Sequence, residues 1–157
     1  METAICTTIK SIAKNQWEAC RSSKGGGDPF LSYDFFSLLE TSNSIGRNTG
    51  WAPFYIAFKE KNVVVGIIVS FLKNHSQGEY VFDHSWADAY QRSGGNYYPK
   101  LQVAVPFTPV SGERILVREE YEDRVDEMLS SAKRLVKENN LSSLPVSYTH
   151  LTLPTKA

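Results

Sequence analysis

The chain has 157 residues, 41% of them hydrophobic and 22% charged, which is the composition of one globular domain and excludes a disordered protein. The charges of its 17 basic and 17 acidic residues cancel. The net charge therefore gives no electrostatic reason to expect DNA or an anionic membrane as a partner.

The first quarter of the chain alternates between strand and helix patterns. β-Branched residues over 3–12 predict a first strand, and Asn15 is suited to cap a short helix over 16–22. The run KGGGDP over 24–29 predicts a flexible break, and helical spacing of apolar residues predicts a second helix over about 30–42.

A hairpin is predicted next, with strands over 52–59 and 62–73 on either side of a tight turn at 60–62. The second strand is apolar on both faces, so we expect it in the centre of a sheet. Its run VVVGIIVSFL, over 63–72, is about half the length that crosses a bilayer, which predicts no integral membrane segment.

The second half of the chain adds a strand over 101–105, a long helix from about Ile115 to Glu138, and a further strand from Leu141. The helix prediction rests on an apolar stripe with a period of 3.6 residues, and on acids in the first half and bases in the second. The order of elements predicts an α+β fold with a mostly antiparallel sheet covered by helices.

The two cysteines, Cys6 and Cys20, form no CxxC pattern, which argues against a disulfide framework or a metal site. The N-terminal twenty residues lack the basic and apolar regions of a signal peptide. These features predict a cytoplasmic protein.

The stretch GEYVFDHSWADAY, over 78–90, places three carboxylates, a histidine and four aromatic rings in thirteen positions. We interpret it as the lining of a binding cleft. Asp83 and Asp88 are the candidate catalytic bases, although Asp83 is equally suited to cap a helix over 84–91. His84 has a pKa in the useful range but stands alone, which favours a spectator role.

Candidate substrate-binding residues continue from this stretch into the next strand. The aromatic rings are candidates for stacking on a sugar, peptide or base, with core packing as the alternative for Trp86. Lys100 is suited to neutralise a phosphate or carboxylate, with a solvated lysine at a strand end as the alternative. The predicted substrate-binding residues are Trp86, Tyr90, Tyr97, Tyr98, Lys100 and Gln102.

The segments that carry a family resemblance are DPFLSYDFFSLLE, TGWAPFYIAF, GEYVFDHSWADAY, YYPKLQVAVPFTPVSG and the long predicted helix ending in LVKENNLSSL. Through them the chain resembles the FemAB-like bacterial family of peptidoglycan biosynthesis or recognition proteins, which is also grouped with GNAT-type acyltransferases. The resemblance implies a GNAT-like acyl-CoA N-acyltransferase fold. It also implies a parent protein with two such folds in tandem, of which this chain would be the first half.

In the GNAT superfamily a glycine-rich loop before a helix cradles the pyrophosphate of acyl-CoA with backbone N–H groups. The matching residues here are Val110, Ser111, Gly112, Glu113 and Arg114. A single glycine makes this signal weak. Three alternatives therefore stay open for the donor: acyl-CoA, an aminoacyl-tRNA as in Fem-type enzymes, or no donor site in this chain at all.

The resemblance implies one domain over 1–144, truncated from a longer protein. The segment PVSYTHLTLPTKA, over 145–157, resembles a translated sequencing-adapter tail, with a genuine C-terminal strand as the alternative. The expected partners are therefore the missing second half and a cell-wall precursor or aminoacyl-tRNA. We expect the fragment alone to be inactive.

Three functions remain open from the sequence. The first is an acyl- or aminoacyltransferase acting on an amine, such as that of a peptidoglycan precursor. The second is a module that recognises peptidoglycan or a glycopeptide without turnover. The third is an acetyl-CoA-dependent N-acetyltransferase of a small amine.

Overall fold

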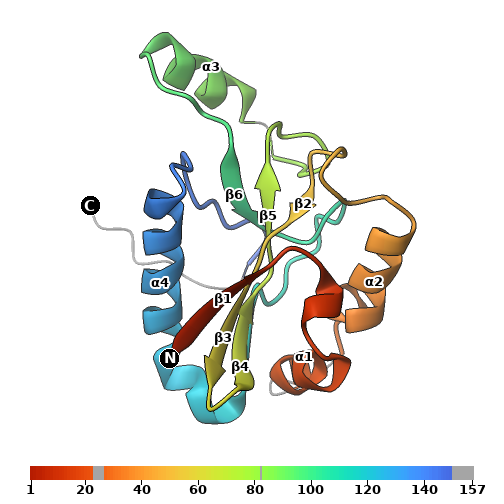
Figure 1. The fold of residues 1–157 in the computed structure, drawn as a ribbon. Coiled ribbons are helices and arrows are strands. Elements are labelled where there is room, and N and C mark those ends of the chain that lie inside the picture. Colours follow the sequence, from red (N-terminus) through yellow and green to blue (C-terminus); the bar gives the residue numbers. More distant parts are fainter. Residues whose placement is uncertain (23–26, 82, 150–157) are drawn as a thin grey trace.

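The computed structural model describes residues 1–22, 27–81 and 83–149, and there the chain forms two antiparallel sheets with flanking helices (Figure 1). The larger sheet has the order β1-β3-β4-β7, and its strands are Glu2–Cys6, Tyr55–Glu60, Val63–Ile68 and Ile115–Val117. The smaller sheet has the order β2-β5-β6, and its strands are Ala52–Pro53, Ser70–Lys73 and Lys100–Val103. The predicted α+β class with antiparallel strands is confirmed.

One long hairpin belongs to both sheets. β3 and β4 pair in the larger sheet, and the same two chain segments pair as β2 and β5 in the smaller one. At the crossing point the Phe54 N–H donates to the Ser70 carbonyl over 3.0 Å, and the Ser70 hydroxyl donates back to the Phe54 carbonyl. The turn lies at Lys61 and Asn62, as predicted, and both residues have a positive φ. The central position of β4 is also confirmed.

Helices lie on both sides of the larger sheet (Figure 1). α1 (Lys14–Arg21) and α2 (Tyr33–Thr41) lie on one side, and α4 (Val125–Glu138) lies on the other. α3 (His84–Arg92) stands apart from both layers, beyond the end of the smaller sheet. Short 3₁₀ helices precede α1, α2 and α4, at Ile9–Ser11, Pro29–Leu31 and Glu119–Arg124.

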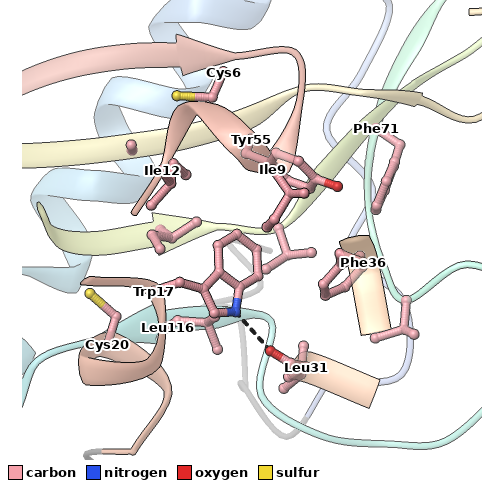
Figure 2. Packing of buried hydrophobic residues seen from close by; sticks show 14 of the residues in the cluster. Cys6, Ile9, Ile12, Trp17, Cys20, Leu31, Phe36, Tyr55, Phe71 and Leu116 are labelled. Carbon is pink, nitrogen blue, oxygen red and sulfur yellow. Dashed lines mark hydrogen bonds between the residues drawn. The ribbon is translucent and has the colours of Figure 1, made fainter. Parts of the chain in front are cut away.

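Aromatic rings fill the core beneath α1 and α2 (Figure 2). Trp17 is fully buried, and its ring centroid lies 5.5 Å from those of Phe36 and Tyr55. Its Nε1–H donates to the Leu31 carbonyl over 2.9 Å, so the buried polar atom of the indole is satisfied. Because core residues cover β4 on both faces, its sequence is apolar almost throughout.

Two predicted boundaries near the N-terminus are wrong. β1 ends at Cys6, because the Thr8 side chain accepts from the Lys10 N–H and starts a 3₁₀ turn where the strand was expected to continue. α1 begins at Lys14, so Asn15 lies inside the helix and does not cap it. The predicted break at 24–29 lies partly outside the described residues. The helix predicted over about 30–42 is confirmed as α2, with Ser32 as its cap.

The helix predicted from Ile115 is wrong in its first part. Ile115–Val117 is strand β7, which pairs with β4 in the register Ile68 to Ile115 and Gly66 to Val117. Three consecutive apolar residues suit a buried strand as well as the apolar stripe of a helix. Here the free edge of β4 is available for pairing, and this selects the strand. The regular helix begins at Val125 and continues to Glu138, where its end was predicted.

The chain after α4 lies beside β6 without forming the regular strand predicted from Leu141. The Leu101 N–H donates to the Ser143 carbonyl and the Val103 N–H to the Pro145 carbonyl, in a parallel alignment. The predicted tail, 145–157, is described only as far as 149. In the described ranges no helix has both the length and the apolar character needed to cross a membrane.

Candidate functional site

Most of the predicted site residues fall in or beside the connection between β5 and β6, residues 74–99, which carries α3. The two strands pair Lys73 with Lys100, so two cations stand opposite each other where this connection leaves the sheet and returns. Like charges in that position destabilise a sheet. Two carboxylates from the connection fold back over the lysines and offset this repulsion.

We call these four buried side chains the ion cluster: Lys73, Glu79, Asp83 and Lys100. Lys100 Nζ lies 2.8 Å from Glu79 Oε2, 2.8 Å from Asp83 Oδ2 and 3.0 Å from Ser76 Oγ. Its three N–H donors are therefore all used, and the formal charges of the cluster cancel. A buried lysine is tolerated only with such pairing.

Lys73 is held less tightly than Lys100. Its Nζ donates to the Gln77 carbonyl over 3.0 Å, lies 3.7 Å from Glu79 Oε1, and lies 3.6 Å from the centroid of the Trp51 ring. Burial lowers the pKa of Lys73 to about 8, and the nearby Glu79 carboxylate limits this fall.

Asp83 directly precedes α3, but its side chain does not cap the helix. Its Oδ2 accepts from Lys100 and, over 2.7 Å, from the Tyr97 hydroxyl. Burial acts to raise the pKa of Asp83, but these hydrogen bonds outweigh it and hold the pKa below its usual range. Since a general base needs a pKa near the working pH, this arrangement suits a fixed charge better than a base.

Two acceptors in the cluster have no hydrogen-bond donor among the described residues, namely Glu79 Oε1 and Asp83 Oδ1. Both atoms are buried, and buried polar atoms are normally satisfied by protein, water or ligand. The cluster therefore has capacity for two further donors.

Four aromatic side chains, on α3 and in the segment before β6, form what we call the aromatic row: Trp86, Tyr90, Tyr97 and Tyr98. Trp86 is 74% exposed and Tyr90 is 45% exposed, and they lie on one face of α3 because they are four residues apart. Edge-to-face contacts link Tyr90 to Tyr97 at 6.1 Å and Tyr97 to Tyr98 at 5.0 Å. Lys100 Nζ lies 5.5 Å from the Tyr97 ring, so the row ends above a cation.

The remaining predicted residues of this region lie apart from the row and cluster. Asp88 is exposed on α3, two residues from both Trp86 and Tyr90 and therefore on another face of the helix. Gln102 is buried, and its Nε2 donates to Ser147 Oγ over 2.7 Å. His84 is exposed in the first turn of α3.

The predicted donor loop, Val110–Arg114, does not precede a helix, because β7 follows it. The prediction that these residues directly precede a helix N-terminus, which would cradle a phosphate, is therefore wrong. Arg114 is buried and donates to the carbonyls of Val110, Glu113 and Ser147, while the Gly112 N–H donates to the Tyr148 carbonyl. Ser111 is exposed. The loop is held by hydrogen bonds within itself and to residues 147–148.

A pocket of about 590 Å³ lies elsewhere, between β2 and the C-terminal end of α2, and none of the predicted site residues lines it. Its walls include Glu40, Ile45, Arg47, Pro53, Phe54 and Leu72. No motif in the sequence marks these residues, since they come from four separate segments. Glu79 and Lys73 were likewise not predicted as site residues, although acidic residues between two lysines at strand ends are a pattern visible in the sequence.

A family model described as FemAB-like, peptidoglycan biosynthesis/recognition, matches residues 8–156. No curated protein matches the chain, and no solved structure does. The GNAT-like fold therefore remains a prediction from the family resemblance. Because the family model spans nearly the whole sequence, this chain belongs to the FemAB-like family of peptidoglycan biosynthesis/recognition.

Proposed function

We propose that the chain binds a peptidoglycan precursor on the face formed by α3 and β6, and that this binding serves acyl or aminoacyl transfer to an amine of the precursor. The family match supports the precursor as the class of ligand. The observation that carries the proposal is the aromatic row, which leads from solvent at Trp86 to a buried cation at Lys100.

The row has the features of a sugar or peptide binding surface. Trp86 and Tyr90 expose large rings on one face of a helix, and exposed apolar surface of this kind marks interaction sites. Rings with a polar tip can cover an apolar ligand face while their hydroxyls remain hydrogen-bonded. The half-buried Tyr97 and Tyr98 continue this surface inward, and their hydroxyls are fixed by Asp83 and Ser76.

The ion cluster is proposed to position this surface. α3 is connected to the sheet through residues that border the cluster, and the Asp83 carboxylate holds Tyr97 by its hydroxyl. The two acceptors to which no described residue donates, on Glu79 and Asp83, give the cluster capacity for N–H groups of an amine or for water. Asp83 is thus proposed as a positioning residue, while Asp88 is exposed on another face of α3, away from the row.

Recognition without turnover is the second candidate. It is favoured by one observation, that Asp83 is already paired through Oδ2 and has a lowered pKa. The engaged Gly112 N–H and the absence of a helix directly after Val110–Arg114 give acetyl-CoA no comparable support.

Tryptophan fluorescence tests the binding face directly. Of the three tryptophans, Trp17 and Trp51 are buried and Trp86 is 74% exposed, so a ligand that covers the row shifts the emission of Trp86 to the blue. We expect soluble muropeptides to produce this shift. Trp86→Ala should weaken binding by about 1–2 kcal/mol, roughly five- to thirtyfold, measured by calorimetry. Trp86→Phe should retain most of the affinity.

Leu38→Ala is the matched control, because Leu38 is 68% exposed on α2, away from the row. If Trp86→Ala leaves the affinity for muropeptides unchanged, the proposed binding face is refuted. Mass spectrometry of muropeptide mixed with the protein and either aminoacyl-tRNA or acetyl-CoA then separates transfer from recognition. A mass increase on the muropeptide identifies the donor, and binding with no mass increase selects the second candidate.

A further inference from the structure

The pocket between β2 and the end of α2 contains two opposite charges that are not paired with each other. Glu40 and Arg47 both line it, and among the described residues neither forms an ion pair. Its volume of about 590 Å³ lies within the range of ~300–1,000 Å³ occupied by small-molecule sites. None of its residues belongs to the ion cluster or the aromatic row.

Glu40 is fixed in place by the surrounding chain. Its Oε1 accepts from the Ile9 N–H over 2.8 Å and from the Tyr55 hydroxyl over 3.1 Å, and its Oε2 accepts from the Thr8 hydroxyl over 2.6 Å. A carboxylate offers roughly four acceptor positions, so one remains. Neutral donors stabilise the negative charge without cancelling it, so Glu40 favours a cation at the pocket wall.

Arg47 brings the complementary group. It is exposed, it follows the loop at Ile45 and Gly46, and no carboxylate of the described chain pairs with it. A guanidinium at the edge of a pocket is suited to bind a carboxylate through two parallel hydrogen bonds.

Apolar residues also line the pocket, including Ile45, Phe54 and Leu72. We infer that this pocket binds a small zwitterion, an amino acid or short peptide whose free ammonium faces Glu40, whose carboxylate faces Arg47, and whose apolar side chains meet the walls. The site does not rest on the function proposed for the α3–β6 face, because the two share no residue.

Calorimetry with leucyl-leucine and two blocked forms tests this assignment. Leucyl-leucine carries both charges, its N-acetyl form lacks the ammonium, and its C-terminal amide lacks the carboxylate. We expect the free dipeptide to bind at least tenfold more tightly than either blocked form. In Arg47→Gln the preference for the free dipeptide over the amide should disappear, while discrimination against the N-acetyl form persists.

Arg134→Gln on α4 is the matched control, since Arg134 is also exposed, and it should bind like the parent protein. In an ¹H–¹⁵N NMR titration, leucyl-leucine should shift the Gly46 amide, which lies in the pocket wall. Absence of binding, equal binding of all three dipeptides, or shifts confined to α3 would each overturn the assignment. These readings are independent of muropeptide binding at Trp86.

Discussion

Replacing Lys100 by methionine tests how strongly the ion cluster holds the connection that carries α3. The side chain is 1% exposed, and its Nζ lies 2.8 Å from carboxylate oxygens of both Glu79 and Asp83. Methionine keeps the length and removes the charge, so two buried acids are left with Lys73 alone. Removing one partner of a buried ion pair costs about 3–5 kcal/mol of unfolding free energy. For a chain of this size that corresponds to a fall in Tm of roughly 6–20 °C.

The expected loss depends on pH. In the parent protein the lowered pKa of Asp83 contributes stability above the unfolded pKa of about 3.9, and this stability is lost as the pH falls through the folded value. In Lys100→Met, burial without the cation raises the pKa of the same group, so the variant gains stability as the pH falls. The difference between the two proteins should be largest near neutral pH and should shrink towards about pH 4.

Urea unfolding followed by circular dichroism, at neutral and acidic pH, measures this difference. The double variant Lys100→Met/Asp83→Asn should recover part of the loss, because it removes one of the stranded charges. Asp88→Asn, on the exposed side of α3, should change stability by no more than about 0.5 kcal/mol. A loss of unfolding free energy below about 1 kcal/mol for Lys100→Met, or a loss independent of pH, would show that the ion cluster does not stabilise the connection between β5 and β6.

Four further outcomes are expected, for Lys73, Gly66 and Trp86. Lys73 should titrate near pH 8 by ¹³C NMR of lysine side chains, and Glu79→Gln should lower that midpoint because the carboxylate favours the charged amine. Since the folded pKa of Lys73 lies below the ordinary lysine value of 10.5, Lys73 should make the unfolding free energy rise between about pH 8 and 10.5, measured as the parent protein minus Lys73→Met. Gly66→Ala should cost about 1–3 kcal/mol by urea unfolding, because the new Cβ meets the Met128 side chain at 2.6 Å, and should cost less in a Met128→Ala background. Trp86→Ala should leave Tm within about 2 °C of the parent, since this ring is 74% exposed.

The sequence predicted those elements of the fold whose pattern had one physical explanation. The turn at Lys61 and Asn62 joins two apolar strands, and no helix accommodates it. Ile115–Val117 was assigned to a helix because three apolar residues fit both periods, and only the open edge of β4 selects the strand. The start of α1 was misplaced because Ala13, which has no capping side chain, precedes it.

The candidate site was predictable in composition but not in pairing. The tyrosines and Asp83 were selected from the sequence, and the structure brings them together with Lys100. The role of Glu79 depends on the register that sets Lys73 opposite Lys100, which is a long-range property of the sheet. The pocket at Glu40 was not predictable, because its walls come from segments that only the tertiary fold assembles.

The hairpin that passes through both sheets has a consequence for how the chain unfolds. Since β2–β3 and β4–β5 are each continuous chain segments, neither sheet can melt without loosening strands of the other. Heating should therefore give a single cooperative transition in which the calorimetric and van't Hoff enthalpies agree. A ligand bound beside either sheet would then protect the whole molecule.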